Sequence, residues 1–101
     1  MDILTPKGQE TLKHEERALE IIGLPYIETP KDEPADVDGF IYDEAIRCVY
    51  EVKCRNVTAE QIIKWGSWLI TQDKVYRGSR IAKSLCVPFV GILYLIPRSA
   101  V

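Results

Sequence analysis

The sequence has few of the residues that build disulfide frameworks, zinc sites or iron–sulfur clusters. Its three cysteines, Cys48, Cys54 and Cys86, form no CxxC pair, so neither a disulfide framework nor a zinc site is expected. One chain cannot supply the four cysteine ligands of an iron–sulfur cluster. His14 is the lone histidine and has no cysteine near it in sequence. We therefore expect buried free thiols.

Long apolar segments are also missing. The longest apolar run, Val87–Ile96, is far shorter than the ~20 residues of a membrane helix. Residues 1–8 lack the apolar core of a signal peptide, so we expect a cytoplasmic protein that does not bind membranes. The 101 residues suit one domain, 1–101. A hydrophobic content of 47% and a charged content of 28% are typical of globular proteins.

Charge is distributed unevenly along the chain. Residues 1–52 carry 5 basic and 13 acidic side chains, a balance of −8, and residues 53–101 carry 8 and 2, a balance of +6. The two halves give the net charge of −2. An acidic half that can hold metal and a basic half that can hold phosphate suit an enzyme acting on nucleic acid. Charged solvated faces would give the same asymmetry.

Apolar periodicity and turn residues predict the order α-β-β-β-α-β. Thr58 and Gln61 fit a capping box at the start of the long helical segment. Two glycines weaken that segment, so we expect a break near Trp68–Thr71 or at Gly78-Ser79. The apolar run before Pro97 predicts a central strand buried on both faces. The predicted elements are a helix over Gln9–Gly23, strands over Tyr26–Thr29, Asp36–Tyr42 and Ile46–Cys54, helical structure from Thr58 to about Leu85, and a strand over Val87–Ile96.

The clearest strand brings charged side chains together. Because side chains alternate along a strand, Glu51 and Lys53 share one face while Val52 points into the core. Asp38, followed by Gly39, lies thirteen residues before Glu51 at another predicted strand. Paired carboxylates hold hard divalent cations, and a neighbouring lysine can orient the attacking water. These groups indicate hydrolysis of a phosphodiester.

Several motifs occur in one order along the chain: Val37-Asp38-Gly39, Glu51-Val52-Lys53-Cys54, Gln72-x-x-x-Tyr76 and the apolar segment Val90–Tyr94. Over about residues 10–96 the chain resembles the PD-(D/E)xK nuclease superfamily, in its RecB-like and lambda-exonuclease-like branches. The resemblance implies an α/β fold with a restriction-endonuclease-like core, in which helices flank a small mixed sheet. Val37 departs from the pattern, since the family has proline before the aspartate.

The resemblance implies a role for each motif residue. Asp38, Glu51 and the backbone carbonyl of Val52 would bind Mg²⁺ or Mn²⁺. Lys53 would position the attacking water and stabilise charge on the phosphate, although it could instead be a plain ion-pair partner of Glu51.

The resemblance also extends to the helix that follows. It implies that Gln72 reaches the active site and that Tyr76 supports the metal site or contacts nucleic acid. Packing of Tyr76 in the core is the alternative.

Two choices between neighbouring acidic residues stay open. An acidic residue on the first helix completes many sites of this family. Glu15 lies within the apolar stripe, and Glu16 with Arg17 resembles the Glu-Arg pair of archaeal Holliday-junction resolvases. Our preference is Glu16, as a further metal ligand. Asp36 could replace Asp38, because it is predicted to share its strand face.

We expect DNA as the partner and metal-dependent DNA cleavage as the function. Trp65 and Trp68 could stack on bases, and the short chain suggests a homo-oligomer or a partner protein. Compactness is typical of a phage or mobile-element protein. A Holliday-junction resolvase, a non-catalytic DNA-binding subunit and an unrelated α/β interaction protein are the alternatives. The candidate phosphate-binding residues are Arg55, Lys74, Arg77, Arg80 and Lys83.

Overall fold

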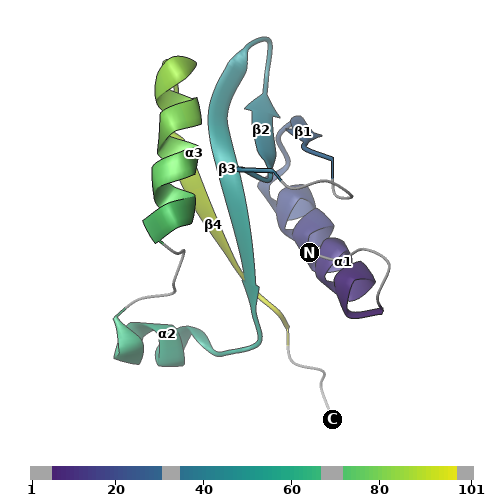
Figure 1. Ribbon diagram of the computed structural model, residues 1–101. Coiled ribbons are helices and arrows are strands. Elements are labelled where there is room, and N and C mark those ends of the chain that lie inside the picture. The colour runs from purple at the N-terminus through teal and green to yellow at the C-terminus, as the bar shows by residue number, and fades with distance from the viewer. Residues whose placement is uncertain (1–5, 31–34, 67–71, 98–101) are drawn as a thin grey trace.

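The computed structural model describes residues 6–30, 35–66 and 72–97 (Figure 1). Its four strands form one sheet in the order β1-β2-β3-β4. The first three strands pair antiparallel, and β4 runs parallel to β3. The predicted α/β class with a small mixed sheet is therefore confirmed. The elements are α1 (Pro6–Ile22), β1 (Tyr26–Glu28), β2 (Gly39–Tyr42), β3 (Ile46–Arg55), α2 (Ala59–Trp65), α3 (Gln72–Ser84) and β4 (Phe89–Leu95).

Helices α1 and α3 cover opposite faces of the sheet (Figure 1). Tyr50 and Val52 of β3 pack with Leu19 of α1 in one apolar cluster. Val49, which points the other way, packs with Ala82 of α3 in a second cluster. The alternation of β3 therefore directs its odd-numbered residues toward α3.

Local sequence signals correctly predicted two of the helix ends. Helix α1 ends just before Gly23, and Thr58 caps α2 with both hydrogen bonds of a capping box. Helix α3 runs without interruption through Gly78, so the break predicted there is wrong. The other predicted break, at Trp68–Thr71, lies outside the described residues. No helix in the described ranges is long and apolar enough to cross a membrane.

Two strand predictions need correction. Strand β2 begins at Gly39 instead of Asp36. Strand β4 lies at the edge of the described sheet and is not a central strand. Its side chains are apolar because they alternate into both clusters: Ile92 packs on the α1 side and Phe89 on the α3 side. Cover from two helices, and not strands on either side, explains the apolar run.

Close packing of α3 on β4 explains why a glycine lies inside the helix. Gly78 is buried, and a Cβ atom at this position would lie 2.6 Å from Cδ2 of Phe89 and 2.9 Å from its Cζ. Such distances are well below van der Waals contact. The ring of Phe89 is itself packed in the α3-side cluster, so it cannot move aside freely.

We expect Gly78→Ala to lower the free energy of unfolding by about 1–3 kcal/mol, because overpacking outweighs alanine's better helix propensity. Urea unfolding followed by circular dichroism measures the change. The control is Ser79→Ala, an exposed position of the same helix, which should gain a few tenths of a kcal/mol. A Gly78→Ala protein more stable than the wild type would contradict the packing of α3 against Phe89.

Candidate functional site

The site lies where β3 continues beyond the first residue of β2. The pairing of these strands begins with Gly39 opposite Tyr50. Asp38 precedes it, and its N–H donates to the Tyr50 carbonyl at 3.0 Å. The Val52 N–H then donates to Asp38 Oδ2 at 2.7 Å. Because a residue on a strand directs its N–H and C=O to the same side, the Val52 carbonyl also faces the side of Asp38.

The backbone of Asp38 is held from β1. The Thr29 hydroxyl donates to the carbonyls of Val37 and Asp38, at 2.8 and 3.0 Å, and the Thr29 N–H donates to the Asp38 carbonyl at 2.9 Å. Gly39 follows with no room for a side chain, since a Cβ would overlap the Ile27 carbonyl and the Tyr50 ring. These contacts fix where the Asp38 carboxylate can lie.

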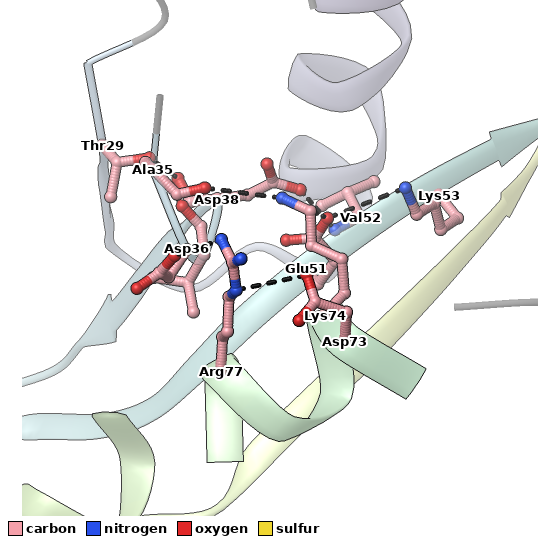
Figure 2. A network of polar contacts seen from close by, with 11 residues as sticks. Thr29, Ala35, Asp36, Asp38, Glu51, Val52, Lys53, Asp73, Lys74 and Arg77 are labelled. Atoms are coloured by element: carbon pink, nitrogen blue, oxygen red, sulfur yellow. Dashed lines mark hydrogen bonds and ion pairs between the residues drawn. The ribbon is translucent and has the colours of Figure 1, made fainter. Parts of the chain in front are cut away.

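Glu51 is a buried carboxylate, 3% exposed, on the α3 side of β3. The ammonium groups of Lys53 and Lys74 each lie 3.7 Å from its Oε1 (Figure 2). Lys74 comes from α3, and its Nζ also donates to the Ala35 carbonyl at 3.4 Å. A buried carboxylate is costly unless cations compensate its charge. Two lysines from different elements supply that compensation here.

Asp38, and not Asp36, lies against β3. Asp36 precedes β2, so the premise that it shares a strand face with Asp38 is wrong. Its exposed carboxylate accepts from Arg77 at 3.4 Å, and Arg77 also pairs with Asp73 at 3.1 Å. The structure therefore places Asp36 in a surface network that joins α3 to the segment before β2 (Figure 2).

On α1 the structure buries Glu15, 6% exposed, and leaves Glu16 exposed. Burial, followed by the negative charges of Glu15 and Asp38, raises the pKa of the Cys54 thiol to about 11. Both carboxylates therefore lie near Cys54. The charge of Glu16 instead contributes, after burial and Glu28, to a raised pKa of Tyr26. The structure brings Glu15 toward Asp38 and does not bring Glu16 there.

The Gln72-x-x-x-Tyr76 motif faces solvent. Gln72 is exposed, and Tyr76 is 63% exposed, which rules out core packing for Tyr76. The guanidinium carbon of Arg80 lies 5.8 Å from the Tyr76 ring centroid. Lys74 is the α3 residue whose contact with Glu51 the structure records.

The spacing of the helix explains this arrangement. Lys74 shares the inner face of α3 with the buried residues Gly78 and Ala82, four and eight positions further on. Small residues at four and eight positions after Lys74 mark the face of α3 that packs on the sheet. This spacing was the signal in the sequence that could have identified Lys74 as a residue of the site.

The remaining candidates are placed as follows. Arg80 and Lys83 are exposed on α3. Arg55 is half-buried and donates to the carbonyl of Cys54 at 3.1 Å. Trp65 is 59% exposed, and Trp68 lies outside the described residues. The expectation of buried thiols is wrong for Cys86, which is exposed, and Cys48 and Cys54 are only partly buried.

No family model matches this chain, and neither the curated proteins nor the solved structures gave a match. A function is therefore inferred from the geometry of the site.

The candidate metal-binding atoms of Asp38, Glu51 and Val52 are hard oxygens. Within the described ranges, no group of three or more His, Cys, Asp or Glu side chains is arranged to hold a metal ion. Mg²⁺ in substrate sites is usually held by one or two carboxylates, with water and substrate phosphate completing the octahedron. Asp38, Glu51 and the Val52 carbonyl suit that mode. Ammonium groups from Lys53 and Lys74 at Glu51 show that this position favours positive charge.

Proposed function

We propose that the protein is a Mg²⁺- or Mn²⁺-dependent nuclease that hydrolyses phosphodiester bonds of DNA. The observation that carries the proposal is the contact of Asp38 Oδ2 with the Val52 N–H, between buried Glu51 and Lys53 along β3, where this strand extends past the first residue of β2. An ordinary surface ion pair between Glu51 and Lys53 would not require a carboxylate that is only 3% exposed. It would also leave the Asp38 contact with the β3 backbone unexplained.

Each group has a chemical role in this proposal. Asp38, Glu51 and the Val52 carbonyl would hold the cation, which supplies Lewis-acid stabilisation of the phosphate and activation of water. Lys53, with its side chain 26% exposed, can reach a phosphate in solvent while it stays beside Glu51. Its ammonium would orient the attacking water and stabilise negative charge that develops on the phosphate.

The surface next to the site suits a nucleic acid. Exposed Arg77, Arg80 and Lys83 follow α3 away from Lys74, and such side chains neutralise phosphates without reading sequence. Tyr76 is exposed on the same helix and could stack on a base. Binding that depends on these residues should weaken strongly with added salt.

A homo-oligomer or a partner protein stays part of the proposal. Strand β4 forms an edge of the described sheet with seven residues that carry no charge, and uncharged edge strands can pair with another chain. Exposed apolar side chains also gather around the end of α1 and β1, at Ile21, Ile22, Leu24 and Ile27.

Cleavage of labelled DNA tests the proposal. Linear duplex, closed circle, single strand and four-way junction are incubated with Mn²⁺ or Mg²⁺, and with EDTA. We expect metal-dependent cutting by the wild type and a loss of at least about 100-fold in Lys53→Ala, because a positioned proton-transfer or charge-stabilising group contributes on this scale. The charge-matched control is Lys64→Ala, an exposed position in α2, which should cut like the wild type.

The pattern of results separates the alternatives. Cutting by Lys53→Ala at the wild-type rate would contradict the assigned role of Lys53. Preference for the junction would identify a resolvase. A folded protein that binds these DNAs and cuts none of them would instead be a DNA-holding subunit.

A further inference from the structure

Lys74 occupies a position that a solvent-facing phosphate contact does not explain. Its side chain is 36% exposed, and its ammonium lies between Oε1 of Glu51 and the carbonyl of Ala35, on three different segments of the chain (Figure 2). Lys53 stands at the same distance, 3.7 Å, from the same Glu51 oxygen. One buried carboxylate oxygen is therefore shared by two cations.

We propose that Lys74 couples metal binding to nucleic-acid binding: it neutralises Glu51 while no metal is bound, and moves to a substrate phosphate when a divalent cation takes its place. This inference rests on the proposed function. It assigns Lys74 a positioning role, in contact first with Glu51 and then with the substrate phosphate, separate from the role of Lys53.

The coupling follows from competition for one oxygen. A divalent cation at Glu51 repels the nearby Lys74 ammonium and must displace it, which weakens metal binding to the protein alone. A phosphate beside the site offers the displaced ammonium a new partner in reach of solvent. The two ligands therefore favour one another, and thermodynamic linkage requires the effect to be the same in both directions.

The arrangement of α3 gives Lys74 a defined path between the two partners. Lys74 is near the start of α3, and the Arg77 side chain ties the same turn to Asp36. Since Arg77 is exposed one turn further along the helix, a phosphate held beside it would lie near the solvent end of the Lys74 side chain.

Calorimetric titration with Mn²⁺ tests the coupling, first with the protein alone and then with a short duplex bound. Methylene groups replace the 3′ oxygens of this duplex, so that the P–O3′ bond to be hydrolysed is absent and the charge is kept. We expect Lys74→Met to bind Mn²⁺ alone roughly tenfold more tightly than the wild type. DNA should tighten Mn²⁺ binding roughly five- to tenfold in the wild type, and less than about twofold in Lys74→Met.

Two further variants act as controls. Lys74→Arg keeps the charge and should keep the coupling. Lys64→Met removes the same charge from an exposed position of α2 that has no assigned part in binding metal or phosphate, and should bind Mn²⁺ alone like the wild type. Circular dichroism melting verifies that each variant is folded.

Each result bears on one hypothesis or on both. A folded Lys74→Met protein that binds Mn²⁺ no more tightly than the wild type, or that keeps the coupling to DNA, overturns the role of Lys74. Metal binding that is lost in Glu51→Gln but is independent of Lys74 would overturn only this inference. No Mn²⁺ binding by the wild type or Lys74→Met, with or without DNA, would overturn the proposed nuclease as well.

Discussion

Glu51→Gln should abolish measurable Mn²⁺ binding and slow DNA cleavage by at least about a thousandfold. Glutamine keeps the size of the side chain but replaces the charged ligand with a neutral amide, beside two lysines that repel the cation. Lewis-acid stabilisation by a metal ion is worth several kcal/mol, and each 1.36 kcal/mol corresponds to about tenfold in rate. Single-turnover cleavage and Mn²⁺ calorimetry measure the two effects.

A pair of neighbouring aspartates supplies the matched control. Asp38→Asn should weaken Mn²⁺ binding because it removes the charge of a proposed cation ligand, whose Oδ2 accepts a hydrogen bond from the Val52 N–H. Asp36→Asn makes the same chemical change two residues away, at an exposed carboxylate paired with Arg77, and should bind Mn²⁺ like the wild type. The metal site is misassigned if Glu51→Gln retains wild-type Mn²⁺ affinity, or if Asp36→Asn loses more affinity than Asp38→Asn.

Folding of Glu51→Gln can be followed separately from its activity. Lys53 and Lys74 have side chains that are 26% and 36% exposed. Each ammonium can therefore be hydrated when the carboxylate is gone. We expect the variant to remain folded, as a circular dichroism melt would show, so that its lost activity is a property of the site.

Strand β3, which carries Glu51 and Lys53, was the element that the sequence predicted most directly. Period-2 alternation over residues 46–54 predicted β3 and placed Glu51 and Lys53 on one face. That alternation reflects local backbone geometry, which needs no knowledge of the rest of the chain. The Thr58 capping box is equally local, and the structure contains both of its hydrogen bonds.

Long-range relations were harder to predict. The apolar residues of β4 indicate that its two faces are covered, but cover by α1 and α3 gives the same pattern as a central strand. The burial of Glu15 depends on the rotation of α1 about its axis. The apolar stripe that contains Glu15 did indicate the buried face, whereas the Glu-Arg resemblance that favoured Glu16 carries no information on that rotation.

The helix α3 shows why a motif can be present and face away from the expected site. Gln72 and Tyr76 share one face by spacing, as predicted. Which face packs on the sheet is decided by Gly78 and Ala82, because only small side chains permit the close approach of Phe89. That packing turns Lys74 inward and leaves Tyr76 in solvent.

Gly39→Ala should lower the free energy of unfolding by about 3 kcal/mol, the upper range for overpacking. A Cβ here would lie 2.6 Å from Cζ of Tyr50 and would overlap both its hydroxyl and the Ile27 carbonyl. Tyr50 is 1% exposed and cannot swing into solvent. For a domain of this size such a loss shifts the melting temperature by roughly 12–24 °C. Because Asp38 immediately precedes Gly39, Mn²⁺ affinity should fall as well.

Tyr50→Phe measures how far the Tyr50 hydroxyl opposes a side chain at Gly39, because it removes this atom and keeps the ring. The buried Tyr50 hydroxyl has no hydrogen-bond partner among the residues that the structure describes, so removing it alone should cost little or stabilise the protein. In this background Gly39→Ala should cost less, since one of the overlapping atoms is gone, but the fixed Ile27 carbonyl still opposes the new methyl group. A double-mutant cycle from urea unfolding measures the coupling. Equal costs of Gly39→Ala in both backgrounds would show that the Tyr50 hydroxyl does not limit the space, and that the Ile27 carbonyl and the Tyr50 ring require glycine beside Asp38.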